Sequence, residues 1–219
     1  MARRFRPMTA TDVLELAEPC RGCAFWESSL SDLASSPDHR RVETKADWAA
    51  AVTDHWGYCG VVAYNDHELI GHLMMAPATH VPRLAAFGSA PMSPDAAVLM
   101  SVRVAEEQRG HGVGRHLVQT AAALVARRDI RALEAVGTHH DGPSCMLPAA
   151  WLQSVGFAVV RPHPTTPRLR MDLQTTVRWK PDLSAAWSRL TGLVTQPALP
   201  EPAGYAHAEP ADPLPTSPA

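Results

Sequence analysis

Residues 102–117 read VRVAEEQRGHGVGRHL, and this stretch joins an extended apolar run to a helical pattern. Residues 96–104 are β-prone, whereas apolar residues recur at helical spacing over residues 115–128. The two patterns meet at three alternating glycines, Gly110, Gly112 and Gly114. The amides at a helix start are free, the helix dipole favours negative charge there, and glycine lets an anion approach the backbone. The stretch therefore predicts a phosphate-binding turn between a strand and a helix.

The residues around these glycines support the same interpretation. Arg109 and Arg115 flank the turn and can add charge-assisted contacts to a phosphate. His111 and Val113 are assigned to the turn itself rather than to chemistry. A P-loop needs Gly-Lys-Ser/Thr after its glycines, and this stretch has none. The dinucleotide fingerprint needs a third glycine where this chain has Arg115. The remaining alternative is a plain tight turn, which rarely needs three alternating glycines between arginines.

The chain on either side of this turn alternates between strand and helix patterns. Two β-prone runs are separated by Asn65-Asp66-His67, which favours a hairpin. The strand–helix–strand order over residues 96–136 implies a parallel pair with a right-handed crossover. The other connections are hairpin-like, so we predict a mixed sheet in an α/β (α+β) fold. The expected strands are residues 3–8, 58–64, 69–75, 96–104, 130–136, 157–161 and 169–173, and the expected helices start at Thr9 or Thr11 and cover 45–52, 115–128 and 146–155.

Three regions of the chain differ in composition. Residues 1–175 are expected to form the folded domain, residues 176–195 a C-terminal helical extension, and residues 196–219 a disordered, proline-rich tail. Within the domain, residues 20–37 are expected to be irregular. The proline-rich connection over residues 76–95 is long enough to be functional or mobile.

Composition narrows the classes of function. The 219 residues carry 20 Lys and Arg against 22 Asp and Glu, so the formal net charge is −2. This balance argues against nonspecific binding to nucleic acid or to an anionic membrane. The N-terminus lacks the apolar core of a signal peptide, and no run has the length of a membrane span. We therefore expect a cytoplasmic protein whose four cysteines are thiols rather than a disulfide framework.

Two segments carry a resemblance to a known family. Arg109-x-x-Gly112-x-Gly114, after a strand and before a helix, resembles the acyl-CoA signature of GNAT N-acetyltransferases. Ser154-Val155-Gly156-Phe157 is similar to the Gly-Phe step at a helix end in that family. The resemblance covers roughly residues 3–173. Cys20-x-x-Cys23-x-Phe-Trp-Glu27, with Arg161-Pro-His-Pro and Pro167-Arg-Leu-Arg170, also resembles a bacterial branch of the family that has no assigned substrate.

The resemblance implies a fold, a co-substrate and a reaction. The fold would be a mixed, mostly antiparallel sheet flanked by helices, with a splayed parallel pair at residues 99–104 and 130–136. Acetyl-CoA would be the co-substrate, and a primary amine of a small molecule or peptide would attack it directly in a ternary complex. The implied cofactor-binding residues are Val102, Arg103 and Val104 for the pantetheine arm and Arg109, Gly110, His111, Gly112, Val113, Gly114 and Arg115 for the pyrophosphate.

The groups that transfer protons are less evident from the sequence. Many family members have a tyrosine at the position of Leu152, where it protonates the leaving thiolate, so this chain departs from the pattern. Cys145, Ser144 or water can serve instead, although an inert buried thiol is the more common role for such a cysteine. A base must accept the proton of the amine. The candidates are Glu27, His72, His139 and His140.

Other readings of the chain stay open. Without the tyrosine, the protein can be a non-catalytic acyl-CoA-binding module, and the proline-rich tail can make it chiefly a scaffold. Cys20-x-x-Cys23 is half of a zinc site at most, because no second pair of ligands is suitably placed, so no metal is expected. Acceptor specificity is expected to depend on residues 20–52 and 76–95. Oligomeric state is open, with pairing of two copies at the C-terminal sheet edge as the route to a homodimer.

Overall fold

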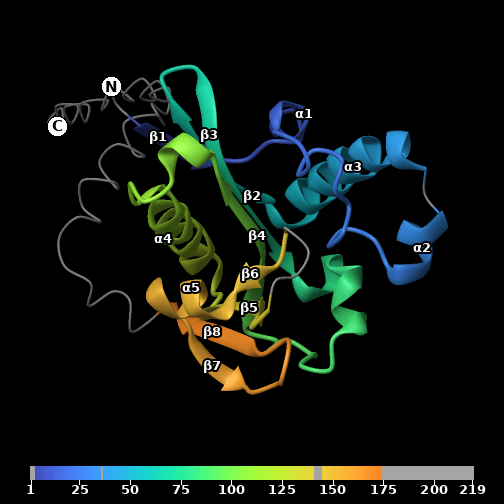
Figure 1. Ribbon diagram of the computed structural model, residues 1–219, viewed down its shortest axis with the longest axis vertical. Helices are drawn as coiled ribbons and strands as arrows, with labels where there is room; N and C mark the ends of the chain where they lie inside the picture. The colour runs from blue at the N-terminus through green and yellow to red at the C-terminus, as the bar shows by residue number, and fades with distance from the viewer. Residues whose placement is uncertain (1–2, 36, 141–144, 174–219) are drawn as a thin grey trace, which may run out of the picture. The chain divides into compact units, whose positions relative to one another are not determined.

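A mixed sheet forms the centre of the computed structural model, which describes residues 3–35, 37–140 and 145–173 (Figure 1). In these residues seven strands follow the order β1-β2-β3-β4-β5-β8-β7, and β6 pairs with β5. The strands are β1 (Arg3–Pro7), β2 (Gly60–Asn65), β3 (Glu68–Pro77), β4 (Ala96–Val104), β5 (Ala132–Thr138), β6 (Leu147–Pro148), β7 (Ala158–Arg161) and β8 (Arg168–Asp172). Neighbours are antiparallel except at β4–β5 and β5–β6, so the predicted mixed sheet is confirmed.

Helices cover both faces of this sheet (Figure 1). The α-helices are α1 (Asp12–Glu15), α2 (Leu30–Ser35), α3 (Asp38–Trp56), α4 (Val113–Val125) and α5 (Ala149–Ser154). The 3-10 helices are η1 (Ala78–His80), η2 (Pro82–Ala86), η3 (Glu106–Gln108) and η4 (Ala126–Arg128). The segments after Leu173 that were expected to form a helical extension and a disordered tail lie outside the described residues.

The alternating side chains of the strands divide the interior into two hydrophobic cores. On β2, Val61 and Ala63 belong to the core under α4 and α5, whereas Val62 and Tyr64 belong to the core under α1 and α3. This two-residue alternation is the expected consequence of the strand pleat. The apolar face of α4, including Leu117, is fully buried against the first core. The sheet is therefore covered on both faces. This packing holds the ends of its central strands in place.

The central parallel strands separate soon after they begin. Strand β4 pairs with β5 only from Ala96↔Ala132 to Val98↔Glu134. Beyond Val98 the outer edge of β4 is no longer paired with β5, while its other edge stays paired with β3 as far as Val104. Strand β6 pairs with β5 later, at Gly137↔Leu147. The predicted splayed pair is therefore present, and it begins at Val98.

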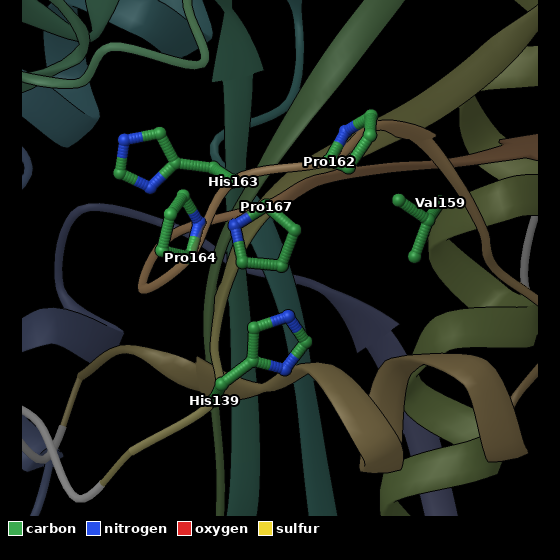
Figure 2. Close-up of a pocket in the computed structure, with 6 residues that line it drawn as sticks. All are labelled: His139, Val159, Pro162, His163, Pro164 and Pro167. Atoms are coloured by element: carbon green, nitrogen blue, oxygen red, sulfur yellow. The ribbon is translucent and has the colours of Figure 1, made fainter.

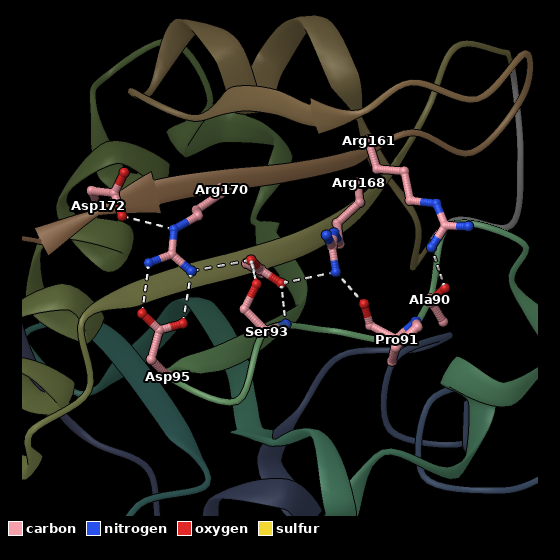
Figure 3. A network of polar contacts seen from close by, with 9 residues as sticks. Ala90, Pro91, Ser93, Asp95, Arg161, Arg168, Arg170 and Asp172 are labelled. Carbon is pink, nitrogen blue, oxygen red and sulfur yellow. Dashed lines mark hydrogen bonds and ion pairs between the residues drawn. The ribbon is translucent and has the colours of Figure 1, made fainter.

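The connection over residues 76–95 is more ordered than the sequence suggested. It contains η1 and η2, and its last part is held against β5 and β8 by charged side chains (Figure 3). Glu134 is fully buried, accepts hydrogen bonds from the Ser93 backbone and hydroxyl at 2.9 and 2.6 Å, and pairs with Arg170 at 3.2 Å. Arg170 also holds Asp95 at 2.9 Å. Because sequence patterns do not show such ion pairs, a proline-rich run looked like a free loop.

Several predicted boundaries were wrong. Helix α3 starts before residue 45 and extends beyond residue 52, and α2 occupies part of the segment expected to be irregular. Helix α5 starts at Ala149 rather than at Met146, because Pro148 precedes it as the N-cap. At α1 the N-cap is Thr11, which makes no side-chain capping bond; instead Asp12 accepts hydrogen bonds from Thr9 and pairs with Arg6. These errors concern where elements begin and end, which local sequence signals define least well.

Candidate functional site: a phosphate turn and a buried pocket

The phosphate turn, residues 109–114, follows η3 and ends in the first turn of α4. Gly110 and Gly112 have φ of 75° and 80°, a backbone conformation that favours glycine. A Cβ built at Gly110 would meet nothing within 4 Å, and one at Gly112 would meet only the His116 ring at 3.7 Å. The space in front of the helix start is therefore open.

Free amides of α4 point into this space. The first intrahelical bond runs from the His116 amide to the Gly112 carbonyl at 3.1 Å. The amides of Val113 and Gly114 precede it, at positions where a helix start supplies no intrahelical acceptor. Their partial positive charge and the helix dipole together favour an anion at this point.

Side chains from elsewhere hold the turn in shape. Arg3 on β1 donates to the His111 carbonyl at 3.0 Å and to the Gln108 side chain at 3.1 Å. The His111 ring nitrogen Nδ1 lies 2.9 Å from the Arg109 carbonyl, which supports its assignment to the turn. The conformation is thus fixed before any ligand arrives, which lowers the entropy cost of binding.

The two flanking arginines donate to the chain itself. Arg109 Nε donates to the Val104 carbonyl at 3.3 Å, and Arg115 Nη2 donates to the Ser154 carbonyl at 2.8 Å. Gly114 differs from the other two glycines, because a Cβ there would lie 3.2 Å from the Trp151 ring and 3.8 Å from Val104. The sequence treats the three glycines alike, whereas the structure divides them into two that shape the turn and one that allows close packing.

The edge of β4 that β5 leaves carries backbone groups at the positions predicted for the pantetheine arm. The Ala105 amide donates to the Ile70 carbonyl on β3 at 2.9 Å. Backbone groups alternate in direction along a strand, so those of Val102 and Val104 face away from β3. Arg103 lies between them, and its backbone faces β3. Two main-chain positions are therefore directed into the gap between the splayed strands.

A buried pocket lies on the face of the sheet that α1 and α3 cover. Its volume is about 10 Å³, which is room for roughly one water molecule. The pocket brings together three residues that the sequence nominated for catalysis, Glu27, His72 and Cys145. Its lining residues are Cys20, Cys23, Trp26, Glu27, Lys45, His72, Ser101 and Cys145.

The charged centre of the buried pocket is an ion pair that the sequence did not reveal. Lys45 Nζ on α3 donates to Glu27 Oε1, and the side chains are only 5% and 1% exposed. Lys45 also lies 3.4 Å from the sulfur of Met74. One signal was available, because Lys45 is one of only two lysines among 20 basic residues. Because nearly all other basic residues of this chain are arginine, a lysine at this position suggests that a closed space requires a compact point charge.

Two polar atoms in the buried pocket have no hydrogen-bond partner among the described residues, namely Glu27 Oε2 and His72 Nε2. Leaving such atoms unsatisfied costs about 1–3 kcal/mol each. Orphaned polar atoms of this kind often mark a ligand or water site. Two residues that line the pocket therefore each have an unused hydrogen-bonding position.

Burial and nearby charge set the protonation state of His72. Its pKa is lowered from 6.5 to about 3, chiefly by burial and also by the positive charges of Lys45 and Arg103. The ring is therefore neutral at pH 7. A neutral imidazole offers one donor and one acceptor nitrogen, so His72 can hydrogen-bond a ligand without changing its charge.

Two thiols in the buried pocket differ in acidity. A hydrogen bond from the Cys145 thiol is the main reason that the pKa of Cys23 is lowered to about 6, with help from the charge of Lys45. The same contact and burial raise the pKa of Cys145. Trp26 Nε1 donates to the Cys145 carbonyl at 3.3 Å and its ring stacks on Phe87 at 5.5 Å. The segment after α1 is thus joined to the residue before β6.

The other catalytic candidates lie outside the buried pocket. His139 and His140 are exposed after β5, and His139 lines an open depression of about 530 Å³ with His163 and prolines (Figure 2). Its lining holds no buried charged group. Leu152 is fully buried in the core and supplies no acid. Ser144 lies outside the described residues.

Within residues 3–35, 37–140 and 145–173, no three His, Cys, Asp or Glu side chains are arranged to hold a metal ion. In the same residues, no helix combines the length and apolar character that a membrane crossing requires.

Comparison with known proteins places this fold. The sequence pattern of the acetyltransferase (GNAT) family matches residues 17–147. The PaiA N-acetyltransferase of Thermoplasma acidophilum, solved with coenzyme A, superposes with a TM-score of 0.54 at 14% identity, over 78% of this chain and 99% of that one. A GNAT-family protein from Desulfovibrio desulfuricans gives 0.51 at 18% identity, over the same shares. A search of curated proteins gave no match.

The matched residues make up more than half of the chain and contain the phosphate turn, the splayed strands and every lining residue of the buried pocket. The chain therefore belongs to the GNAT acetyltransferase family, and its fold is the one that the sequence resemblance implied. At such low identity the solved structures establish the fold alone.

Proposed function

We propose that this protein transfers an acetyl group from acetyl-CoA to a primary amine of a small molecule or peptide, by direct attack of the amine. The observation that carries the proposal is the position of the two orphaned polar atoms, Glu27 Oε2 and His72 Nε2. They lie in a pocket that Ser101 of β4 also lines, and β4 leads directly into the phosphate turn.

The phosphate turn would bind the diphosphate of the co-substrate. The open space at Gly110 and Gly112 and the free amides of α4 fit an anion, and the family membership supports acetyl-CoA as its source. The exposed backbone of Val102 and Val104 would hold the pantetheine arm as a further strand-like partner. Arg109 and Arg115 would turn from their present carbonyl acceptors toward phosphate oxygens, since charge-assisted hydrogen bonds are stronger than neutral ones.

The buried pocket would receive the amine. Its nitrogen would donate to Glu27 Oε2 and His72 Nε2, the two positions that lack partners. We assign proton acceptance to Glu27, because Lys45 holds the carboxylate in place. His72 binds a proton poorly when its pKa is about 3, so we assign it a hydrogen-bonding role. Placing the nucleophile and base together supplies both orientation and general-base catalysis.

The leaving thiolate needs less assistance, because its pKa is about that of a free cysteine, near 8.5. Cys145 keeps its proton and lies in the same pocket, so it can donate to that thiolate. Water can serve as well. We therefore expect Cys145 to assist rather than to be required.

The proposal is tested by mixing the full chain with acetyl-CoA and a panel of primary amines and following release of free thiol. Amine-dependent release is expected. Binding of acetyl-CoA without turnover across a broad panel would favour the non-catalytic acyl-CoA-binding module, for which Leu152 in place of a tyrosine is the supporting observation.

A further inference from the structure

Cys23 and Cys145, which lie far apart in sequence, meet in the buried pocket. Cys23 is partly exposed, and Cys145 behind it is 7% exposed. Both residues line the same pocket of about 10 Å³, and Cys145 there lowers the pKa of Cys23. Cys23 is therefore the more accessible of the two residues, and Cys145 lies on the wall of the same small pocket.

We propose that Cys23 and Cys145 form a redox-active pair that small-molecule disulfides oxidise, and that the resulting protein disulfide closes the buried pocket. Cys23 is the modification site and Cys145 is the thiol that resolves it. The effect on activity rests on the proposed function, but formation of the disulfide does not.

The surroundings of Cys23 favour attack by this sulfur. Its pKa of about 6 makes it mainly thiolate at pH 7, and the thiolate is the reactive form. The charge of Lys45 favours the thiolate, whereas the charge of Glu27 opposes it. Arg103 acts on Cys20 and His72, and the neutral His72 adds no charge. The pair therefore has one nucleophilic and one protonated sulfur.

The reaction balances with a disulfide R–S–S–R as the oxidant. The Cys23 thiolate attacks one sulfur, the S–S bond breaks, and one R–S⁻ leaves with the electron pair. The Cys145 thiol then loses its proton to water or to the departed thiolate and attacks Cys23 Sγ, which expels the second R–S⁻. Two protein thiols are oxidised to one disulfide, and R–S–S–R is reduced to two thiols.

Such a bond would fix the pocket in its closed form. With a volume of about 10 Å³ the pocket holds roughly one water, so an amine can enter only if a wall moves. The walls that meet here are the segment after α1, carrying Cys23, and the residue before β6, Cys145. A covalent link between them adds to the existing Trp26–Cys145 hydrogen bond. Oxidation would therefore prevent the opening that the acceptor needs.

The other two described cysteines fit this role less well. Burial raises the pKa of Cys20, so it is the poorer nucleophile, although its place in the pocket makes it a competing partner for Cys23. Cys59 is fully buried in the core, where its thiol contacts the Met8 carbonyl at 3.5 Å. Cys59→Ala is therefore the matched control.

The first test uses the full chain with oxidised glutathione at pH 7 and no acetyl-CoA. Intact mass should fall by two hydrogens, and peptide mapping should find Cys23 joined to Cys145, in the wild type and in Cys59→Ala. Cys145→Ser should stop at a glutathione adduct on Cys23. A Cys20–Cys23 link, or no link in the wild type, would overturn the proposal whatever the enzyme's activity.

The second test compares each variant before and after oxidation. Wild-type and Cys59→Ala proteins should lose at least about tenfold in the rate of amine-dependent thiol release and regain it with dithiothreitol, because closure blocks the acceptor. Cys23→Ser should keep whatever rate it starts with. A fully cross-linked wild type that remains as active as the reduced protein would refute the closure step while leaving the thiol pair and the proposed function intact.

The third test asks whether Cys145 makes Cys23 more reactive. At pH 6.5, iodoacetamide should modify Cys23 several-fold more slowly in Cys145→Ala than in the wild type, because loss of the donor raises the pKa of Cys23 and lowers its thiolate fraction. Equal rates would show that Cys145 does not activate Cys23.

Discussion

The phosphate turn is made of consecutive residues and offers main-chain amides to an open space, whereas the buried pocket is made of side chains from five separate segments and is almost closed. The turn would owe its anion affinity to helix geometry and to glycines with positive φ, which are features of one short stretch of chain. The pocket owes its chemistry to which residues meet. The two regions therefore respond differently to mutation, pH and oxidation.

The largest effect is expected at Glu27. Glu27→Gln keeps the shape but removes the base, so kcat should fall by about 100-fold or more while coenzyme A affinity is unchanged. Steady-state kinetics and calorimetry with coenzyme A measure the two quantities. The exposed Glu106 supplies a matched control, Glu106→Gln, which should have near-normal kcat.

The fall in kcat of Glu27→Gln must be distinguished from a loss of folding stability. Glu27→Gln leaves the buried Lys45 without a counter-charge, which typically costs about 3–5 kcal/mol. The double variant Glu27→Gln/Lys45→Met should regain much of that stability in urea unfolding and remain slow. A double variant that recovers both stability and turnover would show that Glu27 is structural.

At the phosphate turn, mutation is expected to weaken the binding of coenzyme A. A side chain at Gly112 would occupy the space for the diphosphate, so Gly112→Val should weaken coenzyme A binding by about 100-fold, the loss of two charge-assisted hydrogen bonds. Gly156 also has positive φ, 110°, but lies away from this space, so Gly156→Val carries similar backbone strain and should keep its affinity. Equal weakening in both variants would indicate strain rather than blocked binding.

The lowered pKa of His72 predicts that the free energy of unfolding depends on pH through this residue of the buried pocket. Its folded pKa of about 3 lies below the ordinary 6.5, so the unfolded chain binds more protons between these values. The stabilisation is present above pH 6.5 and is lost as the pH falls. Between pH 7 and pH 5 this group should remove about 2 kcal/mol from the free energy of unfolding. The loss should vanish in His72→Gln and persist in the exposed control His139→Gln; an unchanged loss in His72→Gln would contradict the assignment.

The smallest effect is expected at Cys145. Cys145→Ala should leave coenzyme A binding intact and change turnover by no more than about threefold, because the leaving thiolate needs little help. Single-turnover kinetics with an active amine measures this step. Complete loss of turnover would show that the thiol is an essential acid.

The same contrast explains what could be predicted from sequence. The glycine turn between β4 and α4, the parallel pair and the hairpin at Asp66 were predicted correctly as structure, because local patterns encode glycine, turn and strand signals. The splay of β4 and β5 came from the family resemblance and is confirmed as well. These features need only a short stretch of chain or a known relative.

The buried pocket could be predicted only in part. Glu27, His72 and Cys145 were nominated singly, and nothing in their spacing indicated that they would meet. The ion pair of Lys45 with Glu27 was missed because the two residues lie 18 positions apart on separate segments. The Arg170–Glu134 pair that orders the connection was invisible for the same reason. Such sites are formed by tertiary contacts, which cannot be predicted from local sequence periodicity.

The central claim is that main-chain amides at the start of α4 receive a diphosphate. Titration calorimetry of the wild-type chain with coenzyme A and with pantetheine, which lacks the diphosphate and nucleotide, tests it most directly. We predict measurable heat and saturable binding for coenzyme A, and binding at least about 100-fold weaker for pantetheine, since the phosphate contacts would be absent. Equal affinity for the two, or no binding of coenzyme A, would contradict the account.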